Sequence, residues 1–202
     1  MLHPIYALLL VAIAAYLIGS IPTGYLIVKA KTGQDIREVG SGSTGATNVK
    51  RVLGKKWFFA VMILDAIKGA LPVVAAKYLY MGDLIGLFPV IAAVMVIVGH
   101  SKPLFLGFKG GKSVASGVGT ILALNFFVGL ILVGVWAIVT WFSKYVSLGS
   151  IVTMIVAPIV MILLNNPICY NIYAFIAMVY VIYLHRENVK RLIQGTENKV
   201  RQ

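Results

Sequence analysis

Long apolar runs constrain the fold of this chain more than any other feature of its sequence. Clear apolar segments cover residues 4–28, 57–80, 84–99, 126–143, 148–164 and 168–184. A helix needs about 20 apolar residues to cross a bilayer, and most of these segments approach that length. Hydrophobic residues make up 60% of the 202 residues and charged residues only 12%, whereas a soluble domain has about 25% charged residues. The sequence therefore predicts an all-α, polytopic integral membrane protein and argues against a soluble enzyme or a secreted disulfide scaffold.

One apolar stretch is too long for a single comfortable span and leaves two topologies open. Residues 113–143 contain Asn125 and begin with small residues, so they form either one long helix or a short helix followed by a normal one. Most of the 18 Lys and Arg residues lie in residues 29–56, residues 100–112, Lys144 and the tail 186–202. Two helices put all four places on one side of the membrane, as the positive-inside rule favours.

The charge pattern thus predicts a single domain over residues 1–202 with seven transmembrane helices, the fourth of them short. The N-terminus is expected outside and the C-terminus in the cytoplasm. The net charge of +12 lies in clusters that suit anionic lipids or phosphorylated substrates, so nucleic acid is not an expected partner. The clusters are named here the first basic segment (residues 29–56), the second basic segment (100–112), the third basic segment (144–150) and the basic tail (186–202).

Glycine and hydroxyl residues alternate in the first basic segment, which reads GSGSTGATNVKR over residues 40–51. Glycines let the backbone curl so that successive N–H groups point at one anion, and arginine can hold a phosphate through two hydrogen bonds. A flexible Gly/Ser linker is the alternative interpretation. The candidate residues are Ser41, Gly42, Ser43, Thr47, Asn48 and Arg51.

The second basic segment ends in the sequence Lys109-Gly110-Gly111-Lys112, just before the expected short helix. A glycine pair at a helix N-terminus, flanked by two lysines, favours phosphate binding through the helix dipole and through charge. Two lysines that anchor the chain at the membrane surface are the alternative. The segment is not a nucleotide-binding Walker A loop, because Leu106 stands where that motif needs glycine.

The third basic segment reads KYVSLGS and places Ser147 and Ser150 three residues apart. On a helix these serines share one face, where they either contact a polar substrate or cap and pack the helix.

The basic tail is preceded by His185, and on a helix His185, Asn188 and Arg191 form one polar stripe, with Glu187 beside it. Histidine can accept a proton near neutral pH, and the other two side chains can orient an anionic substrate. A charged helix end that reaches toward water is the alternative.

A charged pair, Asp65 and Lys68, falls inside the second apolar segment. Charges inside a membrane are costly and tend to be paired or functional, so the two residues either neutralise each other at i, i+3 or position a substrate. No HExxH or CxxC motif occurs, and Cys169 is the only cysteine. We therefore expect no metal site.

Taken together, these motifs resemble one family, the bacterial acyl-phosphate:glycerol-3-phosphate acyltransferases known as the PlsY family. The resemblance runs from GSIPTG at residues 19–24, through LDAIKG at 64–69, to HRENVKRL at 185–192. The family usually shows GSGNxGATN, GGKGVAT and SLAS. Here the departures are Ser43 for Asn, Ser113 for Gly, Ser116 for Thr and Gly149 for Ala. Ser113 is of most interest because it adds a side chain beside the expected phosphate site.

The resemblance implies transfer of a fatty acyl group from acyl phosphate to the 1-hydroxyl of glycerol 3-phosphate, in the bacterial inner membrane and with the active site on its cytoplasmic face. The products are lysophosphatidic acid and phosphate, and no cofactor or metal is required. The expected partners are glycerol 3-phosphate, fatty acyl phosphate and membrane lipids, and both substrates carry phosphate. Our hypothesis assigns phosphate binding to Ser41, Arg51, Lys112 and the Gly110–Gly111 backbone, and glycerol orientation to Ser147, His185 and Asn188. The proton acceptor is either His185 or a substrate phosphate oxygen, and the acyl chain is expected against small residues of 114–124.

A transporter or flippase for a phosphorylated metabolite or lipid is the competing hypothesis. It accounts for the seven spans, for Asp65 with Lys68 and for the phosphate-binding segments. A transporter typically has its site near the membrane midplane and shows repeat symmetry, and neither is evident in the sequence. A non-catalytic membrane scaffold would not need several anion sites on one face.

Overall fold

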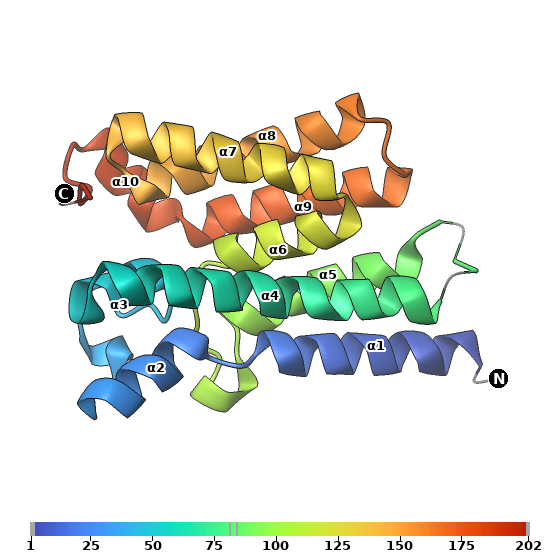
Figure 1. The fold of residues 1–202 in the computed structure, drawn as a ribbon, viewed down its shortest axis with the longest axis horizontal. Helices are drawn as coiled ribbons and strands as arrows, with labels where there is room; N and C mark the ends of the chain where they lie inside the picture. The colour runs from blue at the N-terminus through green and yellow to red at the C-terminus, as the bar shows by residue number, and fades with distance from the viewer. Residues whose placement is uncertain (1–2, 81, 84, 201–202) are drawn as a thin grey trace.

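The computed structural model describes residues 3–80, 82–83 and 85–200, and all regular structure in this part of the chain is helical. Six long helices lie side by side along one axis (Figure 1). They are α1 (Pro4–Gly19), α4 (Lys55–Leu79), α5 (Leu87–Ser101), α7 (Phe126–Ser143), α8 (Val146–Leu163) and α9 (Ile168–Leu184). The predicted all-α class with several membrane-spanning helices is confirmed. Among the described residues five helices are long and apolar enough to cross a membrane, and the bent pair formed by α9 and the helix after it would make a sixth.

Shorter helices complete the described structure. They are α2 (Thr23–Thr32), α3 (Ala46–Leu53), α6 (Val114–Leu124) and α10 (Arg186–Ile193), with two 3₁₀ turns, η1 (Ile36–Glu38) and η2 (Leu104–Leu106). The apolar helix α6 has 11 residues and is therefore about 16 Å long, roughly half of the ~30 Å hydrocarbon thickness of a bilayer. The expectation of a short fourth apolar helix is met.

The helices form two groups with α6 between them. Figure 1 shows α1, α4 and α5 on one side of α6 and α7, α8 and α9 on the other, and α6 contacts α4, α5, α7 and α9. The main core draws buried side chains from both groups, including Val96, Ile121, Met154 and Tyr173. The two groups therefore pack largely through α6, with a further direct contact between α5 and α9.

The long apolar stretch 113–143 divides at Asn125 into α6 and α7, as its charge environment predicts. The Asn125 side chain accepts a hydrogen bond from the N–H of Val128 at 3.1 Å and so caps α7. Lys77 of α4 donates to the carbonyl oxygens of Ala123 and Leu124, at 3.0 and 3.2 Å, at the end of α6. These side chains satisfy backbone groups that a break in a helix leaves without intrahelical partners.

The first apolar segment, expected as one run over residues 4–28, is interrupted in the structure. Helix α1 ends at Gly19 and α2 begins at Thr23, because Pro22 lacks an N–H donor and disfavours helical geometry at the preceding residue. Lys68 of α4 donates to the freed carbonyl oxygen of Ile21 at 2.7 Å. The break redirects the chain into the first basic segment.

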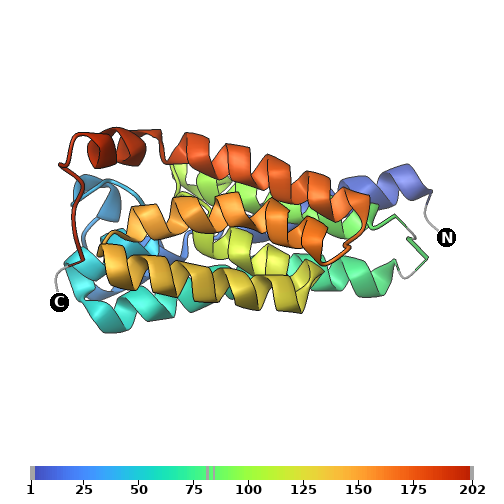
Figure 2. The same cartoon turned by 90° about the horizontal axis from the view of Figure 1, so that it is seen from above.

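The four basic segments lie toward one end of the molecule. Figures 1 and 2 place α2, α3, α10 and the α7–α8 junction at the end opposite the start of α1 and the α8–α9 turn. The second basic segment leaves α5 on the same side and returns into the bundle to begin α6 (Figure 1). Residues far apart in the sequence can therefore meet there.

Helices α4 and α6 approach each other so closely that only small residues fit between them. A Cβ atom at Gly119 would overlap the carbonyl oxygen of Ala66, and a Cβ atom at Gly69 would overlap that of Ser116. Such contacts between small residues are typical of membrane helix interfaces. Ser116 and Gly119 lie on the face of α6 that contacts α4, so this face of residues 114–124 is not open to an acyl chain.

We predict that Gly119→Ala destabilises the protein by about 1–3 kcal/mol through overpacking against backbone that cannot move freely. Gly134→Ala is the matched control, since this glycine lies within α7 and a Cβ there meets nothing within 4 Å. Thermal unfolding of the three proteins in one detergent measures the difference. Equal midpoints for Gly119→Ala and Gly134→Ala would contradict the tight α4–α6 contact.

Candidate active site

The first basic segment folds around the side chain of Asn48, which lies in α3 and is 1% exposed. Its Nδ2 donates to the carbonyl oxygens of Ile36, Val39 and Ser43 at 3.2, 2.9 and 2.9 Å, and its Oδ1 accepts from the N–H of Ser41 at 3.0 Å. Because these contacts occupy both ends of the amide, the expectation that Asn48 binds substrate directly is revised: in this structure it shapes the loop.

The glycine pair of the second basic segment makes backbone hydrogen bonds within its own loop. The N–H of Gly110 donates to the carbonyl of Ser101 at 3.2 Å, and the N–H of Gly111 donates to that of His100 at 3.1 Å. A Cβ at either glycine would overlap His100, so both allow the loop to fold onto the end of α5. The expected nest of free N–H groups at this pair is therefore not formed, and the anion-binding capacity of the loop lies in its lysines.

Lys112 joins the second basic segment to the basic tail. Its Nζ donates to Oδ1 of Asn188 in α10. The other end of that amide, Nδ2, donates to Oε1 of Glu197 at 2.8 Å. Two residues predicted from separate motifs are thus in direct contact.

Glu197 joins these residues, although no sequence motif pointed to it. Its Oε1 also accepts from Ser147 Oγ at 2.9 Å, and its Oε2 accepts from Arg191 Nε at 2.7 Å. Burial opposes ionisation of this carboxyl, but the hydrogen bonds from Asn188, Arg191 and Ser147 outweigh it and hold its pKa below the usual range. The sequence feature that could have drawn attention to Glu197 is that it is the only acidic residue after Glu187, in a tail rich in Lys and Arg.

The cluster formed by Lys112, Ser147, Asn188, Arg191 and Glu197 shows what this region can bind. Three side chains from the third basic segment and the tail direct N–H or O–H donors at one carboxylate. Charged hydrogen bonds of this kind are the strong ones, and the same donors suit the oxygens of a phosphate or a glycerol. These donors are satisfied by Glu197 in this structure, so the cluster shows that this region can hold an anion.

A polar pocket of about 290 Å³ lies beside this cluster and between the first and second basic segments. It is lined by Ser41, Gly42, Ser43, Ser101, Lys102, Phe108, Lys109, Gly110, Gly111, Lys112, Leu184 and Arg186. The hydroxyl of Ser43 already accepts the N–H of Gly45 at 3.3 Å. Ser41 is exposed to the pocket, and Arg186 is a pocket residue that the motif analysis did not single out.

Burial, assisted by the positive charges of Arg191 and Arg51, lowers the pKa of the Lys112 ammonium to about 8. The negative charge of Glu197 opposes this shift, and a bound phosphate would add to it and further favour the protonated form. The electrostatic state of Lys112 therefore indicates a site that accepts an anion.

His185 lies at the junction of α9 and α10 and is buried. Its Nδ1 lies 2.8 Å from the carbonyl oxygen of Val181, so Nδ1 carries the proton and donates. Burial lowers the pKa of His185 to about 4, a shift that the Val181 hydrogen bond opposes and the charge of Lys112 reinforces. His185 is therefore neutral at physiological pH, with Nε2 as its acceptor.

Four other predicted residues do not join the cluster directly. Thr47 and Arg51 are exposed on α3, although Arg51 is near enough to influence Lys112. The side chain of Glu187 is 66% exposed. The hydroxyl of Ser150 donates to the carbonyl of Val146 within α8, at 2.8 Å, which is a helix-internal role.

Asp65 and Lys68 form a buried ion pair of 2.8 Å. His100 approaches the same carboxylate, with Nδ1 and Oδ1 3.8 Å apart. Because Lys68 also holds Ile21 and His100 contacts the Gly110–Gly111 turn, the pair lies beneath the site and supports it. In the described part of the chain no group of three or more His, Cys, Asp or Glu side chains could hold a metal.

Ser113, the departure beside the expected phosphate site, turns away from the pocket. It adopts a left-handed conformation with φ +59°, which explains why the family pattern has glycine there. Its Oγ donates to the carbonyl of Ile97 in α5 at 2.7 Å. The buried hydrogen bond therefore offsets the strain of the left-handed backbone, and the side chain does not point into the pocket.

Comparison with known proteins tests the family resemblance. A family model described as "Glycerol-3-phosphate acyltransferase" matches residues 9–195. This chain belongs to the PlsY family of glycerol-3-phosphate acyltransferases. The resemblance inferred from the motifs is thereby confirmed.

Relatives of this PlsY family member match over nearly their full length. A glycerol-3-phosphate acyltransferase of Trichormus variabilis is 46% identical, with 95% of this chain and 91% of the relative covered. One of Rippkaea orientalis is 45% identical, covering 96% and 93%. Crystal structures of PlsY (YgiH), an integral membrane glycerol 3-phosphate acyltransferase, have TM-scores of 0.91 and 0.88, at 38% and 36% identity and with 96% of each chain covered. They are described as its glycerol 3-phosphate and lysophosphatidic acid forms.

We predict that Ser113→Ala is less stable than Ser113→Gly. Both variants lose the hydrogen bond to Ile97, but only glycine relieves the left-handed strain, which costs about 1–2 kcal/mol for other residues. Thermal unfolding of both variants in the same detergent checks the order. If alanine is as stable as glycine, residue 113 does not adopt this conformation in the protein.

Proposed function

We propose that this PlsY family member transfers a fatty acyl group from acyl phosphate to the 1-hydroxyl of glycerol 3-phosphate and releases lysophosphatidic acid and phosphate. The convergence of Lys112 with Asn188, Ser147 and the polar pocket carries the proposal. It provides adjoining positions for two phosphate-bearing substrates at one end of a bundle of apolar helices. The names of the relatives and of the similar crystal structures support the acceptor and the product.

Lys112 is the central binding group because it borders both the pocket and the Asn188 cluster. We assign phosphate binding to Lys112 with Ser41, Arg51 and Lys109. Ser147, Asn188 and His185 orient the glycerol hydroxyls, with Arg191 beside them. Glu197 then acts as the carboxylate that aligns the Ser147 and Asn188 side chains for their ligand.

The reaction needs no covalent enzyme intermediate, because acyl phosphate is already an activated anhydride. The glycerol 1-hydroxyl oxygen forms a bond to the acyl carbonyl carbon, and the bond between that carbon and the phosphate oxygen breaks. The electron pair of the broken bond leaves with phosphate, and the hydroxyl proton ends on phosphate. Holding both substrates in one site supplies much of the rate increase, and Lys112 and Arg51 stabilise the negative charge that moves onto phosphate.

The environment of His185 favours a substrate phosphate as the proton acceptor. Burial lowers the pKa of His185 to about 4, whereas the second ionisation of a phosphate group has a pKa of about 6. A phosphate oxygen is thus the stronger base, and neutral His185 serves to accept a hydrogen bond from a glycerol hydroxyl through Nε2.

The basic end of the bundle faces the cytoplasm of a bacterial cell, in the inner membrane. This orientation follows from the positive-inside rule. Seven membrane segments are then counted. The first is formed by α1 and α2 together, and the other six are α4, α5, the half-length α6, α7, α8 and α9. An odd number agrees with the start of α1 and the basic tail lying at opposite ends in Figure 1. A transporter is disfavoured because the polar cluster lies at one end and not at the midplane.

An assay with purified protein in a lipid mesophase tests the reaction. Long-chain acyl phosphate and glycerol 3-phosphate should together give phosphate and lysophosphatidic acid in equal amounts. Neither substrate alone should give sustained phosphate release. Lys112→Ala should lower kcat/KM by about 100-fold or more, as expected for loss of a charged contact worth about 3 kcal/mol.

The matched control for this variant is Lys102→Ala, which removes a lysine from the pocket rim but not from the Asn188 contact. It should lower kcat/KM by less than about tenfold. Folded wild-type protein that uses an acyl thioester and not acyl phosphate would overturn the assigned donor. Folded protein that acylates nothing would overturn the reaction itself.

The activity should also fall in alkaline solution. The pKa of Lys112 is lowered to about 8, so the free enzyme loses this positive charge as the pH rises through that value. We expect kcat/KM for glycerol 3-phosphate to fall above about pH 8 in the wild type. Lys112→Arg, which stays charged, should lack this fall even if its activity is lower at every pH. A wild-type profile that is flat to pH 9.5 would contradict the assignment.

A further inference from the structure

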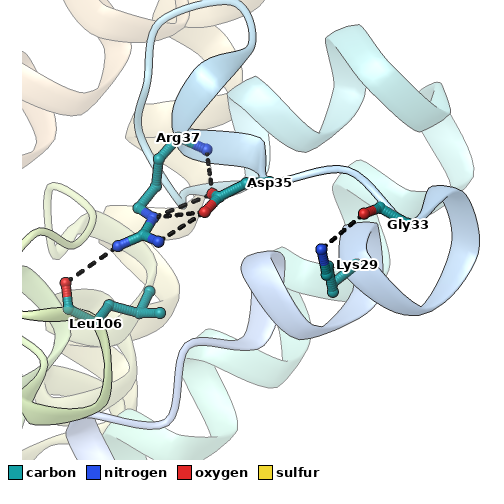
Figure 3. Close-up of polar contacts among 5 residues, drawn as sticks. All are labelled: Lys29, Gly33, Asp35, Arg37 and Leu106. Atoms are coloured by element: carbon teal, nitrogen blue, oxygen red, sulfur yellow. Dashed lines mark hydrogen bonds and ion pairs between the residues drawn. The ribbon is translucent and has the colours of Figure 1, made fainter.

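Two separate loops line the polar pocket, and one side chain links them. Ser41, Gly42 and Ser43 come from the first basic segment, and Phe108 to Lys112 come from the second. Among the described residues, a single hydrogen bond joins these two segments directly. It runs from Arg37 Nη1 to the carbonyl oxygen of Leu106, at 3.3 Å (Figure 3).

The Arg37 side chain is held from several directions. Asp35 accepts from Nε at 3.0 and 3.1 Å and from Nη2 at 2.6 Å, so the carboxylate faces one edge of the guanidinium. The same carboxylate accepts the backbone N–H of Arg37 at 2.9 Å and begins η1. The centroid of the Tyr25 ring in α2 lies 5.5 Å from the guanidinium carbon. With one edge held in this way, Nη1 is left free to reach Leu106 (Figure 3).

The acceptor is as well fixed as the donor. Leu106 ends η2, and its side chain is buried. It lies in the second basic segment, four residues before Gly110, whose N–H donates back to Ser101. A shift of Leu106 away from Arg37 would therefore move the stretch that carries Lys109 and Lys112.

We propose that Arg37 is a positioning residue that sets the width of the phosphate pocket by fastening the first basic segment to the second. This inference rests on the proposed function for its kinetic consequence, since the pocket is assigned to a substrate phosphate. Arg37 does not line the pocket. It acts through the distance between Ser41 and Lys112, and so affects substrate binding more than the chemical step.

The shape of the guanidinium is essential to this role. An arginine can satisfy Asp35 with one edge and Leu106 with the remaining nitrogen, whereas the single ammonium of lysine cannot match this fork. Arg37→Lys keeps the charge and most of the side-chain length, and should nevertheless lose the link between the segments. Asp35→Asn removes the negative charge that holds the guanidinium, and should weaken the link between the segments in the same direction.

Lys29 provides a matched control in the same region. Its Nζ donates to the carbonyl oxygen of Gly33 at 2.7 Å (Figure 3). This bond lies within the first basic segment and closes the end of α2. Lys29→Ala therefore removes one positive charge and one hydrogen bond to a carbonyl, but no contact with the second basic segment.

The kinetic test compares Arg37→Lys, Arg37→Ala, Asp35→Asn and Lys29→Ala in the acyl phosphate assay. For the Arg37 variants we expect KM of at least one phosphate-bearing substrate to rise about 3–10-fold, equivalent to one lost hydrogen bond. At saturating substrate, kcat should stay within about twofold of wild type, because the reacting groups are unchanged. Lys29→Ala should leave both constants within about twofold.

Hydrogen exchange supplies a readout that does not depend on activity. The amides of Gly110 and Gly111 should exchange faster in Arg37→Lys than in wild type, and at the wild-type rate in Lys29→Ala. Unchanged exchange and unchanged KM in Arg37→Lys would overturn the proposal. A fall in kcat without a rise in KM would also overturn it. If Arg37→Lys exchanges faster than wild type but the wild type shows no turnover, Arg37 still links the two segments and the proposed function is what fails.

Discussion

The close contact between α4 and α6 determines where the chemistry-bearing residues can lie. Gly69 and Gly119 allow the two backbones to approach until no Cβ fits between them. Helix α6 is thereby held in the centre of the bundle although it has only 11 residues. Because such a helix spans about half of the membrane, the segment before it must enter the bundle. Lys112 precedes α6 by two positions and is brought to the third basic segment and the tail in this way.

The loops around the pocket satisfy their own backbone before any ligand arrives. Asn48 closes the first basic segment with four hydrogen bonds, and the Gly110 and Gly111 amides are paired with the end of α5. Buried backbone groups are costly when left without partners, and at membrane depth this cost is greatest. We therefore propose that recognition of an anion falls to side chains, chiefly Lys112, Ser147, Asn188 and Arg191. Ser147, Asn188 and Arg191 direct their donors at Glu197, while Lys112 donates to Asn188. The carboxylate offsets part of the positive charge of this cluster and orders its side chains.

Sequence patterns predicted the parts of this structure that follow from local chemistry and from charge. The all-α class, the division at Asn125 and the gathering of the basic segments at one end all follow from hydropathy and the distribution of Lys and Arg. The contact between Lys112 and Asn188 joins two residues singled out from separate motifs. The family assignment also followed from the order of short motifs along the chain.

Other features depend on contacts between residues far apart in the sequence, and no local pattern reveals them. The glycine pair resembles an anion-binding turn, but its amides face the carbonyls of His100 and Ser101. Asn48 resembles a substrate-binding residue in the sequence, but in the structure its side chain holds the loop backbone together. Glu197 lies in a polar tail with no periodic signal, and only the folded chain brings it to Ser147. Ser113 could be recognised as a departure from a glycine position, yet its hydrogen bond to Ile97 required the position of α5.

The proposed reaction depends most on Lys112, which we propose holds a substrate phosphate between the second basic segment and the Asn188 cluster. A crystal structure of this protein with glycerol 3-phosphate, grown from a lipid mesophase, tests it most directly. We expect phosphate oxygens within hydrogen-bonding distance of Lys112 Nζ, and glycerol hydroxyls near Ser147, Asn188 and His185. Glycerol 3-phosphate bound with its phosphate away from Lys112, or in a separate cavity near the membrane midplane, would contradict it.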